Sequence, residues 1–282
     1  MMVTREHLIS DLSRLGVAAG GVMMVHSSLR SIGTVEGGAE TVVDALLESL
    51  GTQGTLVVPT FTFSAPSQPG FIFDPARTPS EMGAISEATR QREEALRSIH
   101  VFHSIAAIGP MAEQIATAGG ASAWDDDSPM GQIANGGQFL LLGVPYSRLT
   151  AIHLVEVRVG VPYRREIEVE MLVRRPNGSL DPVVSTSMPP KAGFSGNDFN
   201  RFGQLLEDEN GVQVGTVGNA MARLVTGAQL LESAIAHYQK DNQIFLKQPG
   251  MREALLTRGH TVVEGNRVMC VVDPQLKHDR TK

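Results

Sequence analysis

A strand that ends in serines is the feature that most constrains this chain. The apolar run Gly21–Val25 stops at His26-Ser27-Ser28 and leads on through Gly33 toward a helical pattern. In α/β proteins, ligands bind where a buried strand ends and hydroxyls and backbone N–H groups become available. The run is neither a GxGxxG fingerprint nor a P-loop. The sequence therefore predicts a phosphate or cofactor cradle at residues 26–33, for a ligand other than a dinucleotide or nucleoside triphosphate.

Strand and helix patterns alternate through the first half of the chain. This alternation predicts an α/β protein with a largely parallel central sheet covered by helices. Residues 166–170 instead alternate as an antiparallel strand does, and Asn177-Gly178 indicates a turn. We interpret about 163–200 as a smaller β-rich excursion within a single domain spanning 1–282. The expected helices are 4–15, 39–50 and 219–240, and the expected strands are 22–25, 55–58 and 139–144.

Net charge, cysteine content and the length of the apolar runs restrict the kind of partner, the chemistry and the location that we expect. The formal net charge of −6 over 282 residues disfavours nucleic acids and anionic membranes and suits a cationic partner. The single cysteine, Cys270, lies in the apolar run Val268–Val272, which predicts a buried strand cysteine rather than a nucleophile. No signal-peptide core and no run of about twenty apolar residues is present. We expect a cytoplasmic protein that binds neither nucleic acid nor membranes.

A histidine and a glutamate follow the strongest strand. With Thr150 as the N-cap of a helix, His153 falls in the first turn and Glu156 lies one turn further on the same face. A histidine near the carboxyl end of a sheet, with a carboxylate to orient it, suits a general base. A core histidine beside a surface glutamate explains the same spacing equally well.

Two other histidines, His100 and His103, are three residues apart. They could bind a metal ion together with His26, His153 and Glu156, but no HExxH or CxxC pattern supports this. Histidines that bond loop backbone near a pocket are the better interpretation, and we predict no metal.

The acidic turn Asp125-Asp126-Asp127 follows the only tryptophan, Trp124. Three carboxylates beside an aromatic ring would attract a polyamine, although a solvated loop needs no function. Asp198 and Glu207 are further acids that the sequence alone assigns to a helix cap and to the surface.

Taken together, these segments resemble the aminoglycoside 3-N-acetyltransferase family, the antibiotic N-acetyltransferases outside the GNAT fold. The resemblance covers about residues 1–240. The matching segments are His26-Ser27-Ser28-Leu29 with Gly33 and Gly37-Gly38, Gly54–Thr60, Arg77–Ser80 with Met82-Gly83, Arg97-Ser98 through His103-Ser104 to Gly109-Pro110, Ser128-Pro129, Leu140–Gly143, Thr150 with Ile152-His153 and Glu156, Asp198-Phe199 with Gly203 and Glu207, and Gly215 with Val217-Gly218.

The resemblance implies a three-layer α/β/α fold that binds acetyl-CoA and transfers its acetyl group to the 3-amino group of a deoxystreptamine aminoglycoside. It implies that His153 is the general base and that Glu156 orients it. Without a plausible nucleophilic cysteine, direct transfer is favoured over an acyl-enzyme. The expected acetyl-CoA residues are Ser27, Ser28, Leu29, Arg30, Ser31, Gly33, His103 and Ser104. The expected acceptor residues are Asp125, Asp126, Asp127, Asp198 and Glu207.

This chain departs from the family pattern at Leu149, where the family commonly has asparagine, and over 160–195, which should help to form the acceptor wall. Another amine, such as a biosynthetic intermediate, is therefore an alternative acceptor. A metal-dependent hydrolase using His100, His103 and His153, or a coenzyme A-binding protein without catalysis, are more distant alternatives. We expect a monomer or a homodimer.

Overall fold

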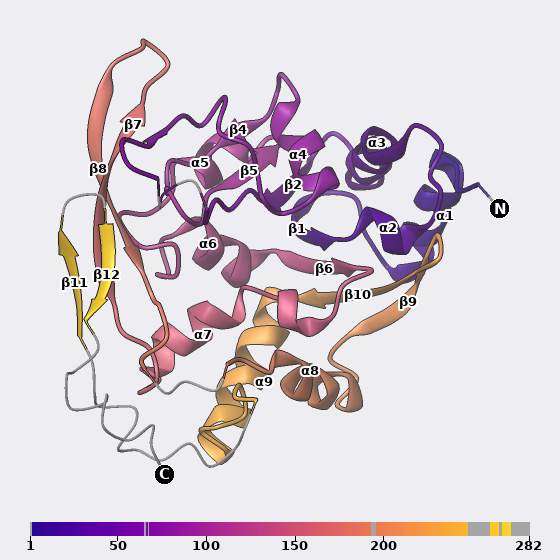
Figure 1. Ribbon diagram of the computed structural model, residues 1–282. Coiled ribbons are helices and arrows are strands. Elements are labelled where there is room, and N and C mark those ends of the chain that lie inside the picture. Colours follow the sequence, from indigo (N-terminus) through magenta and orange to yellow (C-terminus); the bar gives the residue numbers. More distant parts are fainter. Residues whose placement is uncertain are drawn as a thin grey trace.

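The computed structural model describes residues 2–64, 66, 68–192 and 196–247, together with the backbone of 260–264 and 267–271. Within these residues, a mixed α/β fold is built on a seven-stranded sheet with the order β4-β5-β2-β1-β6-β10-β9 (Figure 1). Its strands are β1 (Gly21–Ser27), β2 (Gly54–Pro59), β4 (Leu96–Arg97), β5 (Ile105–Ile108), β6 (Gln138–Leu142), β9 (Gln213–Val217) and β10 (Ala220–Thr226).

Only the centre of this sheet is parallel. β1 pairs in parallel with β2 and with β6, whereas β4, β5, β9 and β10 all pair antiparallel with their neighbours. The prediction of a largely parallel sheet is therefore wrong for the outer strands. An apolar run shows that a strand is buried but does not encode its direction. The tight turn at Gly218-Asn219 joins β9 to β10, and so short a connection permits only antiparallel pairing.

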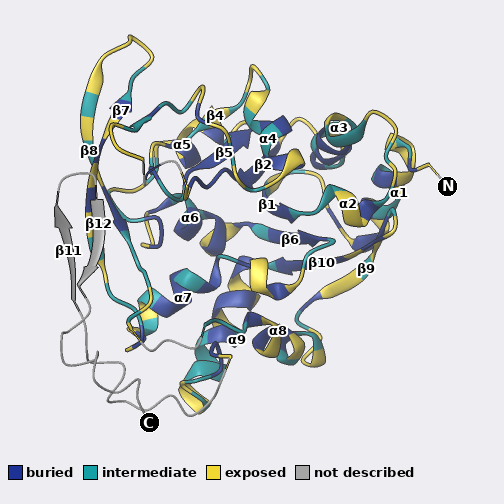
Figure 2. Cartoon of the chain, in the orientation of Figure 1, coloured by how far each residue is buried: buried dark blue, intermediate teal, exposed yellow. Residues whose placement is uncertain are grey.

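Helices cover both faces of the sheet, which confirms the three-layer arrangement. Met23 and Val25 of β1 pack on one side with α1, α3 and α4, while Met24 between them packs on the other with α5–α9. This alternation has the period of two that a strand imposes. Figure 2 shows the strands buried between helices whose outer faces are exposed. The helices are α1 (Arg5–Leu15), α2 (Leu29–Ile32), α3 (Gly38–Leu50), α4 (Ala84–Gln91), α5 (Ala112–Ala116), α6 (Pro129–Gly136), α7 (Ile152–Val159), α8 (Phe199–Asp208) and α9 (Gly227–Lys240).

Sequence signals set the ends of α1 and α3 close to the predicted positions, whereas the predicted helix 219–240 is wrong over its first part, because Ala220–Thr226 form β10 and α9 begins at Gly227. Thr4 caps α1 through a hydrogen bond from the N–H of His7, and Gly16 ends the helix at a φ of 100°. Gly51 ends α3 at a φ of 66°. A left-handed backbone of this kind favours glycine, which explains why both helices stop where the sequence indicated.

The β-rich excursion forms a separate three-stranded sheet. β7 (Ile167–Arg174) and β8 (Leu180–Ser187) make an antiparallel hairpin, and β3 (Ile72–Phe73) pairs in parallel with β7. Phe73, Val169, Met171 and Val173 form its small core. The predicted excursion is thus confirmed, with a third strand that comes from a proline-rich connection.

The C-terminal backbone contains a further hairpin, β11 (His260–Glu264) and β12 (Arg267–Val271). Cys270 lies in β12, whose side chains are outside the described residues, so its predicted burial stays a prediction. Among the helices of the described residues, none combines the length and the apolar character that crossing a membrane requires.

Candidate active site

The helix that carries the predicted base begins later than its sequence suggested. Ala151, not Thr150, occupies the N-cap of α7, and no side chain caps the helix. The hydroxyl of Thr150 instead lies 2.9 Å from Nε2 of His26 at the end of β1. The carbonyl of Thr150 accepts the N–H of His153 at 3.0 Å, so the first turn is still anchored at this residue.

His153 and Glu156 meet as the spacing predicted. Nδ1 of His153 lies 2.6 Å from Oε2 of Glu156, and the carboxylate is fully buried. Among the described residues, Glu156 also accepts hydrogen bonds from Tyr163 Oη at 3.0 Å, from Asn197 Nδ2 at 3.0 Å and from Nε of Arg164. The alternative of a surface glutamate is therefore wrong. No sequence pattern pointed to the last three partners, which come from the connection after α7 and from the segment before α8.

The charges around Glu156 keep its carboxylate ionised, and this carboxylate selects one tautomer of the neutral histidine. Burial raises the pKa of the Glu156 carboxyl, but the neighbouring His153 and Arg164, through charge and hydrogen bonds, outweigh burial and lower the pKa overall. An ionised Glu156 accepts the proton on Nδ1 of His153 and leaves Nε2 with a lone pair. The His153 side chain is 23% exposed, so this imidazole can reach a substrate.

Two aromatic rings pack against the ring of His153. The centroid of Trp124 lies 5.2 Å away and that of Phe199 lies 5.3 Å away, both in edge-to-face geometry. Trp124 also contacts His103 at 5.0 Å, and His103 contacts Phe61 at 5.2 Å. The ring of His153 thus belongs to a row of rings that continues through Trp124 and His103 to Phe61 in the connection after β2.

Backbone groups hold the ring of His100, whereas Nδ1 of His103 is buried and has no hydrogen-bond partner among the described residues. Nδ1 of His100 accepts the N–H groups of Phe102 and His103, and its Nε2 lies 3.1 Å from the carbonyl of Thr186 on β8. Burial lowers the pKa of His100 to about 4 and holds that of His103 well below its usual value. Both rings are therefore neutral near pH 7. In the part of the chain that the structure describes, no three histidine, cysteine or acidic side chains converge on a possible metal site.

The predicted cofactor residues at the end of β1 form one continuous turn. Ser28 caps the short helix α2, where its Oγ accepts the N–H of Ser31 at 3.4 Å and the hydroxyl of Ser31 at 3.0 Å. Arg30 and Ser31 are exposed, while Ser27, Ser28, Leu29 and Gly33 are half-buried. Gly33 has a φ of 100°, and a Cβ there would lie 2.5 Å from the amide of Asn219. This turn, residues 27–33, is called the donor turn below, after the acetyl donor that it is predicted to bind.

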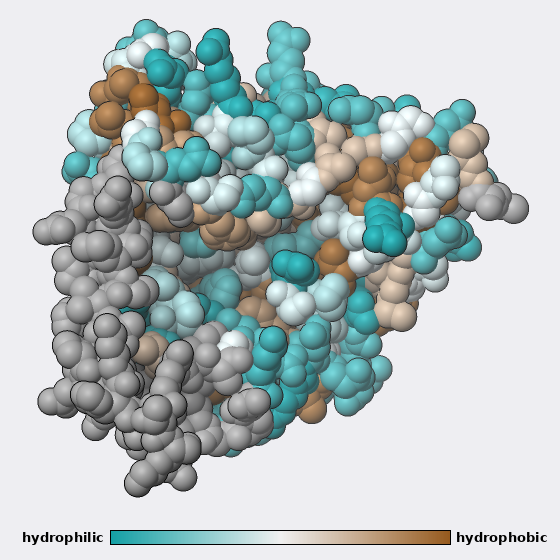
Figure 3. Space-filling view, viewed as in Figure 1, coloured by the Kyte–Doolittle hydropathy of each residue, from teal (hydrophilic) through white to brown (hydrophobic). Residues whose placement is uncertain are grey.

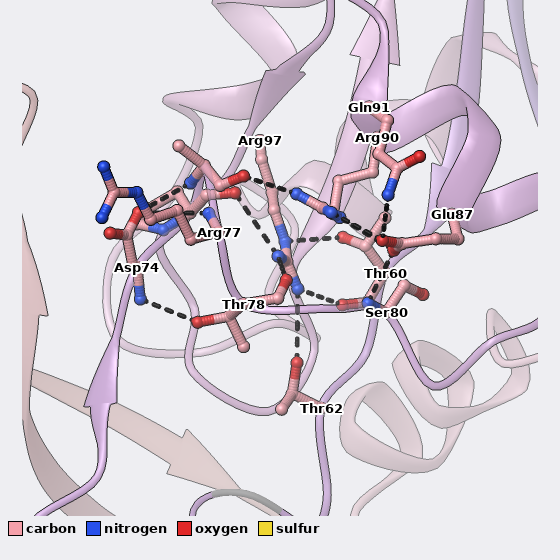
Figure 4. A network of polar contacts seen from close by, with 12 residues as sticks. Thr60, Thr62, Asp74, Arg77, Thr78, Ser80, Glu87, Arg90, Gln91 and Arg97 are labelled. Atoms are coloured by element: carbon pink, nitrogen blue, oxygen red, sulfur yellow. Dashed lines mark hydrogen bonds and ion pairs between the residues drawn. The ribbon is translucent and has the colours of Figure 1, made fainter.

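Ser104 lies in a polar network under the 60–80 connection. It is fully buried, and its hydroxyl donates to the carbonyl of Thr60 at 2.9 Å. Nε of Arg97 donates to the hydroxyls of Thr60 and Ser104, both at 3.1 Å. Its other nitrogens donate to the carbonyl of Thr60 at 2.7 Å, to the hydroxyl of Thr62 and to the carbonyl of Thr78 (Figure 4). Burial lowers the pKa of Arg97 to about 10, so it remains charged. Its role as the organiser of this connection was missed, since an arginine at a strand end carries no such signal.

The predicted acceptor acids lie in three separate places. Asp125, Asp126 and Asp127 are exposed, and Asp126 pairs with Arg158 at 2.7 Å. Asp198 caps α8 by accepting the N–H of Asn200 at 3.2 Å.

Glu207 pairs with Arg223 at 2.6 Å beside a cavity of about 360 Å³. Ser31 of the donor turn lines the same cavity, together with the amides of Asn200 and Gln204. The structure therefore brings Glu207, but neither Asp198 nor the acidic turn, to a cavity shared with the donor turn. Figure 3 shows a recess near the centre of this face of the molecule, where hydrophilic and apolar residues alternate.

Comparison with known proteins identifies the family. A family model described as aminoglycoside 3-N-acetyltransferase matches residues 24–239. Aminoglycoside N(3)-acetyltransferase IV from Salmonella sp is 33% identical over 261 residues, covering 88% of this chain and 93% of that protein. The crystal structure of the aminoglycoside acetyltransferase AAC(3)-IVa apoenzyme is 31% identical with a TM-score of 0.74, covering 91% of this chain and 96% of that one. A histidine-to-alanine mutant of AAC(3)-IVa in complex with a gentamicin is 30% identical with a TM-score of 0.73, covering 90% of this chain and 95% of that one. The chain therefore belongs to the aminoglycoside 3-N-acetyltransferase family.

Proposed function

We propose that this protein transfers the acetyl group of acetyl-CoA to the 3-amino group of a deoxystreptamine aminoglycoside, an activity that confers antibiotic resistance. One observation carries the proposal: a partly exposed imidazole, His153, is fixed through Nδ1 by the fully buried carboxylate of Glu156. Membership of the family supports the acetyl donor and the site of transfer. The gentamicin complex of the AAC(3)-IVa mutant supports the class of acceptor.

The chemistry follows from the state of the acceptor amine. An ammonium group has no lone pair, so a base must remove its proton before or during attack. The ammonium loses that proton to bulk water, and Nε2 of His153 takes a second proton from the nitrogen as it attacks. The ionised Glu156 stabilises the imidazolium that results. The amine nitrogen bonds to the thioester carbon, the carbon–sulfur bond then breaks, and the departing thiolate receives the proton from His153. No covalent intermediate with the protein is required.

The donor turn is the proposed site for acetyl-CoA. Its half-buried Ser27, Ser28 and Leu29 and its exposed Arg30 and Ser31 lie at the carboxyl end of a central parallel strand, where α/β proteins bind their ligands. Arg30 is a cation that the pyrophosphate of the cofactor would attract.

His103 and Ser104 belong to this proposed site in different ways. His103 packs against Trp124, which also contacts the base, so it is placed to line the channel near the reacting thioester. Ser104 is buried beneath the 60–80 connection, so its proposed role is to hold the wall of the channel through Thr60 and Arg97.

The acceptor is proposed to bind in the cavity that Glu207 lines. Glu207 shares a cavity with Ser31, which would bring an amino sugar close to the acetyl donor. The exposed carboxylates of Asp125 and Asp127 supply a general attraction for a polycation. Asp126 and Asp198 are partly committed to Arg158 and to the cap of α8, so we expect smaller contributions from them.

A release assay for free coenzyme A thiol tests the proposal directly. Purified protein is given acetyl-CoA and a panel of deoxystreptamine aminoglycosides and simple amines, and the product is located by NMR. Transfer to the 3-amino group is expected, and His153→Ala should abolish nearly all of it. Turnover of a different amine without turnover of any aminoglycoside would contradict the proposed acceptor but not the chemistry.

A further inference from the structure

A hydrogen bond between two side chains joins the donor turn to the helix of the base. His26 immediately precedes the donor turn, and its Nε2 lies 2.9 Å from Oγ1 of Thr150. His26 is only 5% exposed, whereas Thr150 is half-buried between the fully buried Leu149 and Ala151. Thr150 is therefore the part of this segment that a substrate could reach, and it lies three residues before His153.

The proton in this pair can be assigned from the surroundings of His26. Nδ1 is enclosed and has no hydrogen-bond partner among the described residues. A proton there would leave a buried donor unsatisfied, whereas a proton on Nε2 is accepted by Thr150. Burial lowers the pKa of His26 to about 4, so the ring carries a single proton near neutral pH. We therefore assign the proton to Nε2, which donates to Oγ1 of Thr150.

This assignment leaves the hydroxyl proton of Thr150 available. Its oxygen accepts from His26, and no other hydrogen bond of this hydroxyl exists within the described part of the chain. A hydroxyl that accepts one hydrogen bond becomes a better donor of another, because successive bonds polarise one another. Thr150 is thus an oriented, partly accessible donor next to the base.

We propose that the Thr150 hydroxyl donates to the carbonyl oxygen of the acetyl thioester as this oxygen becomes an oxyanion, and that His26 is the positioning residue that orients the hydroxyl. This inference rests on the proposed acetyl transfer. As the amine nitrogen bonds to the thioester carbon, the carbonyl π electrons move to oxygen, where the Thr150 proton meets them. They return when the carbon–sulfur bond breaks and the thiolate leaves with the proton that His153 carried.

The first test compares two substitutions of Thr150. Thr150→Val has nearly the same shape but no hydroxyl, while the matched control Thr150→Ser keeps the hydroxyl. Loss of one oxyanion donor lowers kcat by roughly 10²–10³-fold. We expect this loss in Thr150→Val, while its KM values for acetyl-CoA and for the acceptor stay within about threefold of the wild type. The kcat of Thr150→Ser should stay within about fivefold of the wild type.

The second test asks whether His26 acts through Thr150. His26→Gln can place an amide nitrogen near the position of Nε2, whereas His26→Asn is too short to do so. We expect His26→Asn to lower kcat by roughly tenfold or more and His26→Gln to retain most activity. In the Thr150→Val background, His26→Asn should cause no further loss of kcat, because the effects of residues that act as one unit are not additive. Melting temperatures of all variants separate this effect from loss of folding.

The outcomes are distinct. A folded Thr150→Val protein with kcat within about threefold of the wild type overturns the oxyanion role, as does a loss confined to KM. Additive losses from His26→Asn and Thr150→Val overturn the positioning role of His26. If the wild type acetylates no aminoglycoside, the proposed function fails instead, and this comparison is then made with whichever amine the protein does acetylate.

Discussion

Replacing Glu156 by glutamine removes one charge from the centre of the site with little change in shape. Arg164 can only donate hydrogen bonds, so the amide oxygen must face its Nε, on the side where Nδ1 of His153 also donates. The amide NH₂ then faces Tyr163, which can accept, and Nδ2 of Asn197, which cannot. His153 therefore keeps its proton on Nδ1 and its lone pair on Nε2.

The loss in rate should consequently reflect charge alone. The imidazolium formed during transfer loses its counter-ion while Arg164 remains. Two unit charges 4 Å apart interact by about 4 kcal/mol at an effective dielectric constant of 20. We take roughly a third to a half of this as the net effect, because the carboxylate is shared with other donors, which corresponds to a kcat about 10–30-fold lower.

Glu156→Gln should also destabilise the fold. Removing one partner of a buried ion pair costs about 3–5 kcal/mol. Since the pKa of Glu156 is lower in the folded protein, its stabilising effect is present above the carboxyl pKa of the unfolded chain and is lost as pH falls through the folded value. Urea denaturation between pH 7 and pH 3 should show this acid-dependent loss in the wild type and a weaker one in Glu156→Gln.

Asp181→Asn is the matched control, because Asp181 pairs with Arg175 on the exposed β7–β8 hairpin. It should cost less than about 1 kcal/mol. The reasoning fails if Glu156→Gln matches this control in stability. It fails equally if Glu156→Gln loses as much rate as His153→Ala, because the histidine would then have changed tautomer.

The same geometry supports three further predictions. His153→Ala should lower kcat by roughly 10²–10⁴-fold, the usual contribution of a general base, while the affinity for acetyl-CoA measured by calorimetry barely changes. Replacing the three acids of the turn 125–127 by asparagine should raise KM for a polycationic acceptor. The increase should shrink as salt rises from about 0.05 to 0.5 M, because the screening length falls from about 14 to 4 Å over this range. A change that does not depend on salt would indicate direct contact instead. Arg97→Lys should lower the free energy of unfolding by roughly 1–3 kcal/mol for each buried acceptor it leaves unpaired, because lysine has fewer donors, and a urea midpoint unchanged from the wild type would contradict this.

The sequence predicted well those features that depend on neighbouring residues. The bounds of α1 and α3, the end of β1 at the serines and the contact of His153 with Glu156 all follow from spacings of a few residues. The direction of the outer strands was not predictable in this way. Burial dictates the apolar run of β5, but its antiparallel pairing with β2 depends on the route of the long connection between them.

The N-cap prediction for Thr150 shows why local reasoning did not find this part of the site. A threonine before an apolar helix is ordinarily a cap because its hydroxyl can satisfy a free N–H of the first turn. Here the buried imidazole of His26, 124 residues away in the sequence, takes that hydroxyl instead. A helix start without a side-chain cap is less stable, by about 1 kcal/mol in typical cases. The uncapped helix start lies next to the proposed base, and the Thr150 hydroxyl that does not cap the helix is available to a substrate. The hydrogen bond between His26 and Thr150, which contradicts the sequence pattern, is therefore the one most worth testing for a role in catalysis.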